Sequence, residues 1–243
     1  MQIEALSVEL RPRSMAEAAD LGAALVRQHA ASVWRTFTPL YVVIVLLALA
    51  CAEIAPWLPV LIIFWLKPWL DRSLLFVLSR AVFGQSTCWN DLWAARSAVW
   101  WGQWPATLLW RRLSPWRAFT QPAYQLEGQR GKAGRTRRAL MLKAKRGAAV
   151  GMHAALAHVE AALYLGALSL LLWFAPEGSR GHVLSWLGGS ESLGNVLVST
   201  LLYAAAVLVV EPFYVAAGLA MYLNRRVELE AWDIEQEFRR AFR

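Results

Sequence analysis

The sequence predicts an all-α, polytopic membrane protein with about four transmembrane spans and amphipathic helices at the cytoplasmic interface. Three observations predict this class. First, 58% of the 243 residues are hydrophobic and the mean hydropathy is +0.37, above the apolar share of an ordinary soluble domain. Second, only 17% of residues are charged, yet the net charge is +8, as in membrane proteins whose cytoplasmic loops collect Lys and Arg. Third, several stretches approach the roughly 20 apolar residues that cross about 30 Å of hydrocarbon.

The N-terminal region, residues 1–33, is predicted to stay in the cytoplasm because it has charged residues and no apolar signal-peptide core. Leu6–Arg11 alternates apolar and polar residues and is interpreted as a short extended piece. Ser14 and Glu17 have the spacing of a capping box, which predicts that a helix begins there. We interpret Ser14–Ser32 as an amphipathic helix at the inner membrane surface.

Four apolar stretches are predicted to cross the bilayer. They are Trp34–Ala52 and Ile54–Val82, within residues 34–84, and Gly147–Ala175 and Ser192–Leu223, within residues 147–223. The second stretch is short or broken, because Lys67-Pro68 halts its apolar run and Asp71-Arg72 follows. The sequence leaves open whether it forms one tilted helix or a re-entrant pair.

The distribution of Lys and Arg predicts the orientation. Between Arg111 and Arg146 there are eleven Lys or Arg residues and one acid, Glu127, whereas Pro176–Ser190 carries little charge. The positive-inside rule then places the basic loop and both termini in the cytoplasm.

The predicted location is a bacterial inner membrane. The predicted partners are the lipid bilayer, with anionic lipid at the cytoplasmic face, and other membrane proteins or further copies of the chain. A nucleic-acid partner is not expected, since hydrophobicity this high has no use on a duplex.

Residues 85–146 combine this basic loop with a tryptophan-rich segment, Thr87–Leu113, which holds six of the fourteen tryptophans. Four of them share one arc of a helix and are predicted anchors at the membrane interface: Trp89, Trp93, Trp100 and Trp104. We interpret the segment as an interfacial helix that ends at Pro105. The alternative is that the tryptophans pack inside the protein. A fifth span is disfavoured by the polar residues of the segment.

Ionisable residues at membrane depth are candidates for function. The predicted buried charge cluster consists of Lys67, Asp71, Arg72, Glu160 and Glu211. Lys67 and Asp71 are spaced i, i+4 and could pair on a continuous helix. The cluster could be a set of ion pairs that closes the helix bundle, or it could carry protons or ions.

The chain shows no catalytic, cofactor-binding or metal-binding motif. Its two cysteines, Cys51 and Cys88, make no CxxC or zinc pattern. We therefore expect no enzymatic activity and no cofactor. Gly147 and Gly151 form a GxxxG, a weak pattern that permits close helix packing or dimerisation.

The chain ends in a charged cytoplasmic helix, residues 224–243, that follows the last span. A stripe at helical spacing joins the span to it: Tyr222, Arg226, Glu230 and Asp233. Arg226 and Glu230 can pair within the helix. This helix is predicted to dock against the N-terminal helix or the basic loop.

The stripe, with Pro212 before it, resembles the last helix of bacterial membrane proteins of the glycerophosphoryl diester phosphodiesterase membrane-domain-like family. It departs from that family's pattern at Asn224, Glu228 and Ala231. The stretch "KPWLDRSLLFVLSRAVFG" resembles an uncharacterised proteobacterial inner-membrane family. That resemblance implies a genetic neighbourhood with transglutaminase-like membrane proteins and AAA+ ATPases. Neither resemblance implies a catalytic residue, because the phosphodiesterase activity belongs to a separate soluble domain.

The leading hypothesis is a non-enzymatic structural or accessory subunit of a membrane protein assembly. The alternative is a small transporter or lipid-handling protein that uses the buried charge cluster. An intramembrane enzyme is the third hypothesis.

Overall fold

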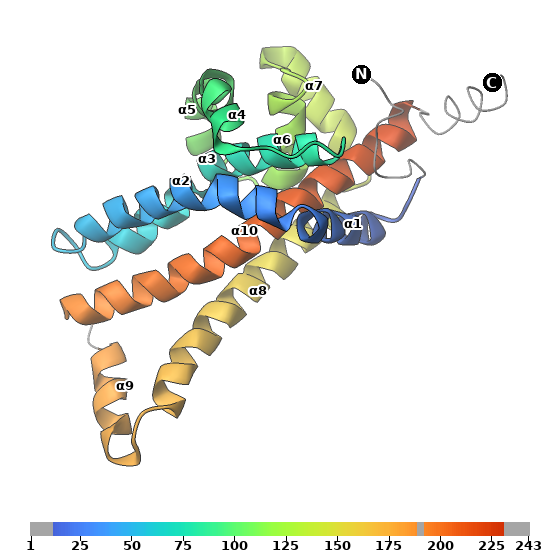
Figure 1. Ribbon diagram of the computed structural model, residues 1–243. Coiled ribbons are helices and arrows are strands. Elements are labelled where there is room, and N and C mark those ends of the chain that lie inside the picture. The colour runs from blue at the N-terminus through green and yellow to red at the C-terminus, as the bar shows by residue number, and fades with distance from the viewer. Residues whose placement is uncertain (1–11, 189–191, 231–243) are drawn as a thin grey trace. The chain divides into compact units, whose positions relative to one another are not determined.

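The computed structural model describes residues 12–188 and 192–230 (Figure 1). All regular secondary structure in these two ranges is helical, as the sequence predicts. The extended piece predicted at Leu6–Arg11 lies outside the described residues, as do Asp233 and most of the charged helix predicted at residues 224–243.

Three of the described helices are long and apolar enough to cross a membrane. They are α2 (Ala30–Ala50), α8 (Arg146–Trp173) and α10 (Leu193–Glu230), which correspond to the first, third and fourth predicted spans. The segment predicted as the second span forms α3 (Leu58–Ala81), a single continuous helix. It is one helix rather than a re-entrant pair. Because it contains several charged residues, α3 is not among the helices apolar enough to cross a membrane.

The helices contribute to two compact units. Unit 1 comprises residues 1–37, 68–154 and 212–243, and unit 2 comprises residues 38–67 and 155–211. Three of the four helices that belong to both units carry an internal proline next to the division, at Pro39, Pro68 and Pro212. A proline inside a helix removes one backbone hydrogen bond, so these helices lack a hydrogen bond close to where the units divide.

Unit 1 begins with α1 (Met15–Gln28), where the capping prediction is confirmed in part. The Ser14 hydroxyl accepts a hydrogen bond from the Glu17 backbone N–H at 3.1 Å. The Glu17 carboxylate, however, accepts from Arg13 at 2.8 Å instead of closing the second half of the box. The amphipathic helix ends at Gln28, before the predicted Ser32, because α2 already starts at Ala30.

Two glycines let helices of unit 1 approach α10 closely, as the ribbon also shows (Figure 1). A Cβ atom on Gly22 of α1 would lie 2.5 Å from the Ala216 carbonyl oxygen of α10. On α10 itself, a Cβ atom on Gly218 would lie 2.5 Å from the Ala118 carbonyl carbon of α6 (Arg117–Gln125). Both positions need glycine because backbone occupies the space of a side chain.

The prediction of one interfacial helix ending at Pro105 was wrong. The segment forms three short pieces, α4 (Trp89–Ala94), the π-helical turn η2 (Ser97–Trp101) and α5 (Trp104–Leu108). Gln103 is left-handed, with φ of 57°, and Pro105 is the second residue of α5 rather than the end of a helix. Proline fits the first turn of a helix, where its missing N–H has no helical partner.

Since the helix is broken, the four tryptophans do not form one stripe. The rings of Trp89, Trp93 and Trp100 cluster, with centroids 5.8–6.4 Å apart. Trp100 is buried and donates its indole N–H to the Ser73 hydroxyl at 2.9 Å. Trp104 packs edge-to-face with Trp101 instead. Trp100 thus follows the alternative of internal packing, whereas Trp93 and Trp104 are exposed.

The basic segment of unit 1 continues into α7 (Gly131–Leu142). In unit 2, a short turn of 3₁₀ helix, η3 (Glu177–Ser179), and α9 (Arg180–Gly188) follow α8.

Candidate functional site

Unit 2 contains a buried three-residue ion cluster formed by Lys67, Glu160 and Glu211, which come from α3, α8 and α10. The Lys67 ammonium lies 2.5 Å from the Glu160 carboxylate and 2.7 Å from the Glu211 carboxylate. The Glu211 side chain is 1% exposed, that of Lys67 9% and that of Glu160 15%. One ammonium therefore bridges two carboxylates away from solvent.

Tyrosines of unit 2 lie next to this ion cluster. The Tyr203 ring packs edge-to-face against Tyr164. The Tyr41 hydroxyl donates to the Ala204 carbonyl oxygen at 2.8 Å. The second contact satisfies the buried Tyr41 hydroxyl, for which an unmade hydrogen bond would be costly.

The charges of the ion cluster do not cancel. With every group ionised, two carboxylates and one ammonium leave one negative charge, and a buried charge is stable only when it is paired or neutralised.

The structure brings together three of the five residues in the predicted cluster. Asp71 and Arg72 belong to unit 1 and have other partners, so the predicted Lys67–Asp71 pair is replaced by the two glutamate contacts. The Asp71 carboxylate lies 3.3 Å from the Arg117 guanidinium. The Arg72 guanidinium donates to the backbone carbonyls of Val99 and Ala98. A helical repeat shows that Lys67 and Asp71 can meet, but only the packed chain shows which carboxylates reach Lys67.

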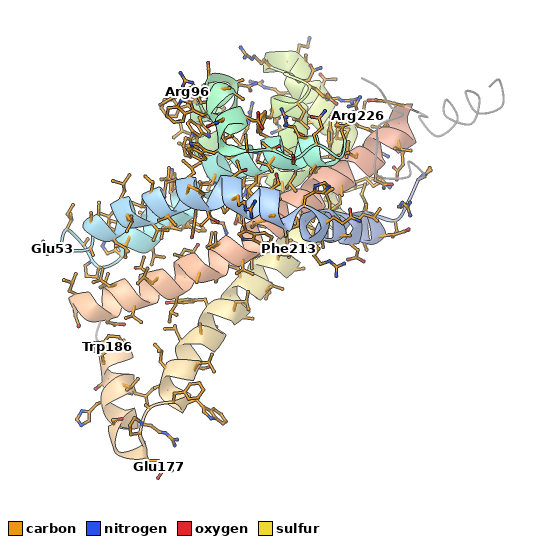
Figure 2. All side chains as sticks on the ribbon, viewed as in Figure 1. Glu53, Arg96, Glu177, Trp186, Phe213 and Arg226 are labelled. Atoms are coloured by element: carbon orange, nitrogen blue, oxygen red, sulfur yellow. The ribbon has the colours of Figure 1, made fainter. Side chains whose placement is uncertain are left out.

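The C-terminal stripe of α10 takes part in a second charged network, in unit 1. Tyr222 donates its hydroxyl hydrogen to the Glu127 carboxylate. Arg226, near the end of α10 (Figure 2), pairs with Glu230 at 2.7 Å. Arg137 of α7 joins both acids, at 2.6 Å from Glu127 and 2.5 Å from Glu230. The hydrogen bonds to Glu127, and then those to Glu230, raise the pKa of Arg137 despite its partial burial.

Two further contacts hold the same end of α10. Asn224 exchanges two hydrogen bonds of 2.9 Å with the backbone N–H and carbonyl of Arg13. Glu228 accepts from Lys145 at 2.8 Å and pairs with Arg225 at 2.7 Å. The end of α10 therefore contacts Arg13, just before α1, and Lys145 of the basic segment, whereas the sequence predicted docking against the N-terminal helix or the basic loop.

Sequence reasoning missed Arg117 and Arg137 as members of these networks, and Tyr41 and Tyr203 as neighbours of the ion cluster. Their roles depend on which helices become neighbours, and a single sequence does not show that. Glu127 carried a usable signal, because it is the one acid among eleven basic residues and now bonds Tyr222 and Arg137. Within the described ranges, no group of three or more His, Cys, Asp or Glu could hold a metal ion.

The fold thus defines an all-helical protein with three membrane-capable helices in its described ranges. Comparison with protein-family models, with curated proteins and with solved structures found no match for the chain.

Proposed function

We propose that this protein is a non-enzymatic subunit of an inner-membrane protein assembly, with its termini and basic loop in the cytoplasm. The observation that carries the proposal is the outward face of α8. This helix is long and apolar enough to span a membrane, yet no residue of its most apolar stretch is buried. Ala149 is the one residue of α8 that is fully buried.

Five small residues lie on this outward face, together with His158 and Leu165. At about 100° per residue they fall within an arc of roughly 100°. The small residues are Gly147, Gly151, Ala155, Ala162 and Gly166, all exposed. A Cβ atom on any of the three glycines would meet nothing within 4 Å. Glu160, which binds Lys67, lies on the opposite side of the helix.

Lipid alone does not explain this face. Glycine inside a helix lowers helix stability by about 1 kcal/mol relative to alanine. Larger apolar side chains would pack against lipid tails equally well. Small residues at four-residue spacing instead let another transmembrane helix approach closely. We infer that the occupant is a helix of a different membrane protein, consistent with the absence of catalytic motifs in the sequence.

The test is gentle purification from native membranes followed by mass spectrometry of the intact complex. Two variants of α8 sharpen it: Ala162→Leu fills the face of small residues, whereas Ala157→Leu makes the same change at an exposed position about 140° away. The proposal expects a stoichiometric partner protein with the wild type and Ala157→Leu, and its loss with Ala162→Leu. A monomer, or an oligomer of this chain alone, would contradict the accessory role.

A second candidate function is proton- or cation-linked transport, favoured by the buried ion pairs that Lys67 makes with Glu160 and Glu211. The purified chain, reconstituted in vesicles, would then carry a proton flux that Glu211→Gln abolishes while the protein stays folded. An accessory subunit shows no such flux.

A further inference from the structure

Unit 1 contains a pocket whose charged side chains are all basic. Residues of α3, α5, α6, α7 and the segment between α5 and α6 line it, and the pocket is small and partly open to solvent. Four arginines contribute to the lining, Arg72, Arg111, Arg117 and Arg138, and no Asp or Glu does. Such a concentration of one charge needs a compensating group.

The chain compensates one of these arginines. Arg117 pairs with Asp71 at 3.3 Å. In the described ranges, no carboxylate lies within ion-pair distance of Arg72, Arg111 or Arg138. Three positive charges are therefore left over in a half-enclosed space.

The basic residues at the end of α10 do have carboxylate partners. At the end of α10, Arg137, Arg226 and Lys145 each have a glutamate partner within 2.8 Å. Burial lowers the pKa of the Arg111 guanidinium, and the positive charge of Arg138 lowers it further. A bound anion would relieve this repulsion, and the described residues supply none.

Arg111 and Arg72 are also held in position before any ligand binds. The Arg111 guanidinium stacks on the Tyr124 ring, 3.5 Å from its centroid, and donates to the Gln103 side chain at 2.8 Å. Arg72 is fixed by the carbonyl of Ala98. The Ser114 hydroxyl in the lining is buried and has no hydrogen-bond partner among the described residues, so it is available as a donor.

We propose that this pocket binds a phosphate group. Guanidinium groups present paired donors that match phosphate oxygens and bind them more strongly than neutral donors do. The phosphate could belong to the headgroup of an anionic phospholipid or to a soluble phosphate. Large apolar side chains next to the pocket residues in sequence, Leu109, Trp110 and Leu113, are exposed, and this favours the lipid, whose acyl chains would cover them.

The test compares lipid retention and phosphate protection in three proteins. The wild type, Arg138→Gln and Arg135→Gln are purified in mild detergent with phosphatidylglycerol or phosphatidylcholine, and bound lipid is counted by native mass spectrometry. Arg135 lies on the same helix, α7, but outside the pocket lining, so its variant controls for the loss of one positive charge. Melting temperatures with and without inorganic phosphate are measured in parallel and also report whether each variant folds.

We expect the wild type and Arg135→Gln to retain phosphatidylglycerol over phosphatidylcholine. Retention by Arg138→Gln should fall about tenfold, the effect of losing one hydrogen bond to a charged group. If inorganic phosphate instead raises the melting temperature with the same dependence on Arg138, while no lipid is selected, the phosphate site stands and its ligand is soluble. Equal behaviour of the two variants in both assays would overturn the proposal.

Discussion

The Lys67 ammonium and the Glu211 carboxylate lie 2.7 Å apart, although they come from different helices, α3 and α10. Glu160 of α8 shares the same ammonium at 2.5 Å. Lys67 thereby ties three helices of unit 2 together, and its removal would leave two carboxylates without their cation.

The first prediction concerns this dependence on Lys67. Lys67→Met should lower the free energy of unfolding by about 3–5 kcal/mol, because it leaves buried carboxylates uncompensated. Adding Glu160→Gln and Glu211→Gln should restore most of that stability, since a neutral cluster pays no such desolvation cost. Thermal unfolding in detergent measures both effects. A triple variant as unstable as Lys67→Met would show that the charges themselves are not the cause.

A second prediction tests the close approach of α6 to α10. Gly218→Ala should destabilise unit 1 by about 1–3 kcal/mol, because the added methyl group meets the backbone at Ala118, which can move only with its helix. Gly194→Ala, on the same helix, meets only side-chain atoms at 3.7 Å or more. There the helix propensity of alanine should dominate, with a gain of up to about 1 kcal/mol. If both variants unfold at the same temperature, α6 does not pack on α10 in this way.

The third prediction concerns Glu127, which Tyr222, Arg137 and Arg226 all contact. Glu127→Gln should cost about 1–3 kcal/mol, because two arginines and a tyrosine lose a charged acceptor while partly buried. Glu177→Gln serves as the control, since Glu177 is exposed. Proteolysis of the α7 segment reports the loss directly: α7 should become sensitive in Glu127→Gln alone.

The sequence predicts the parts of this structure that depend on residues close together in the chain, and not the parts that depend on contacts between distant helices. The helices α1, α2, α8 and α10 depend on local patterns, such as Ser14 before Glu17 and long uncharged runs, and they lie close to the predicted ranges. The prediction for the tryptophan segment was wrong because it assumed that the helical period continues through Gly102 and Gln103, where the backbone turns.

In the candidate site, the sequence likewise identifies the charged residues but not which of them pair. Glu160, Glu211 and Lys67 could be identified because charge within apolar helices is expensive and therefore conspicuous. That Lys67 contacts the two glutamates, while Asp71 contacts Arg117, depends on helix neighbours that no periodicity reveals. The arginine pocket was hidden for a related reason: its residues look like an ordinary topology-determining basic loop until the fold gathers them.

The last prediction tests the orientation on which the proposed function rests. Arg130 lies in the basic segment between α6 and α7, and Gly178 lies in the turn after α8. The excess of Lys and Arg around Arg130 should hold that segment in the cytoplasm, because such residues near a span resist translocation. A fluorescent reporter that matures only in the cytoplasm should therefore be active after Arg130 and inactive after Gly178, and an exported phosphatase should give the reverse. Phosphatase activity after Arg130 would place the Arg72–Arg111–Arg138 pocket and the end of α10 on the external side, where neither a cytoplasmic lipid headgroup nor a cytoplasmic partner could reach them.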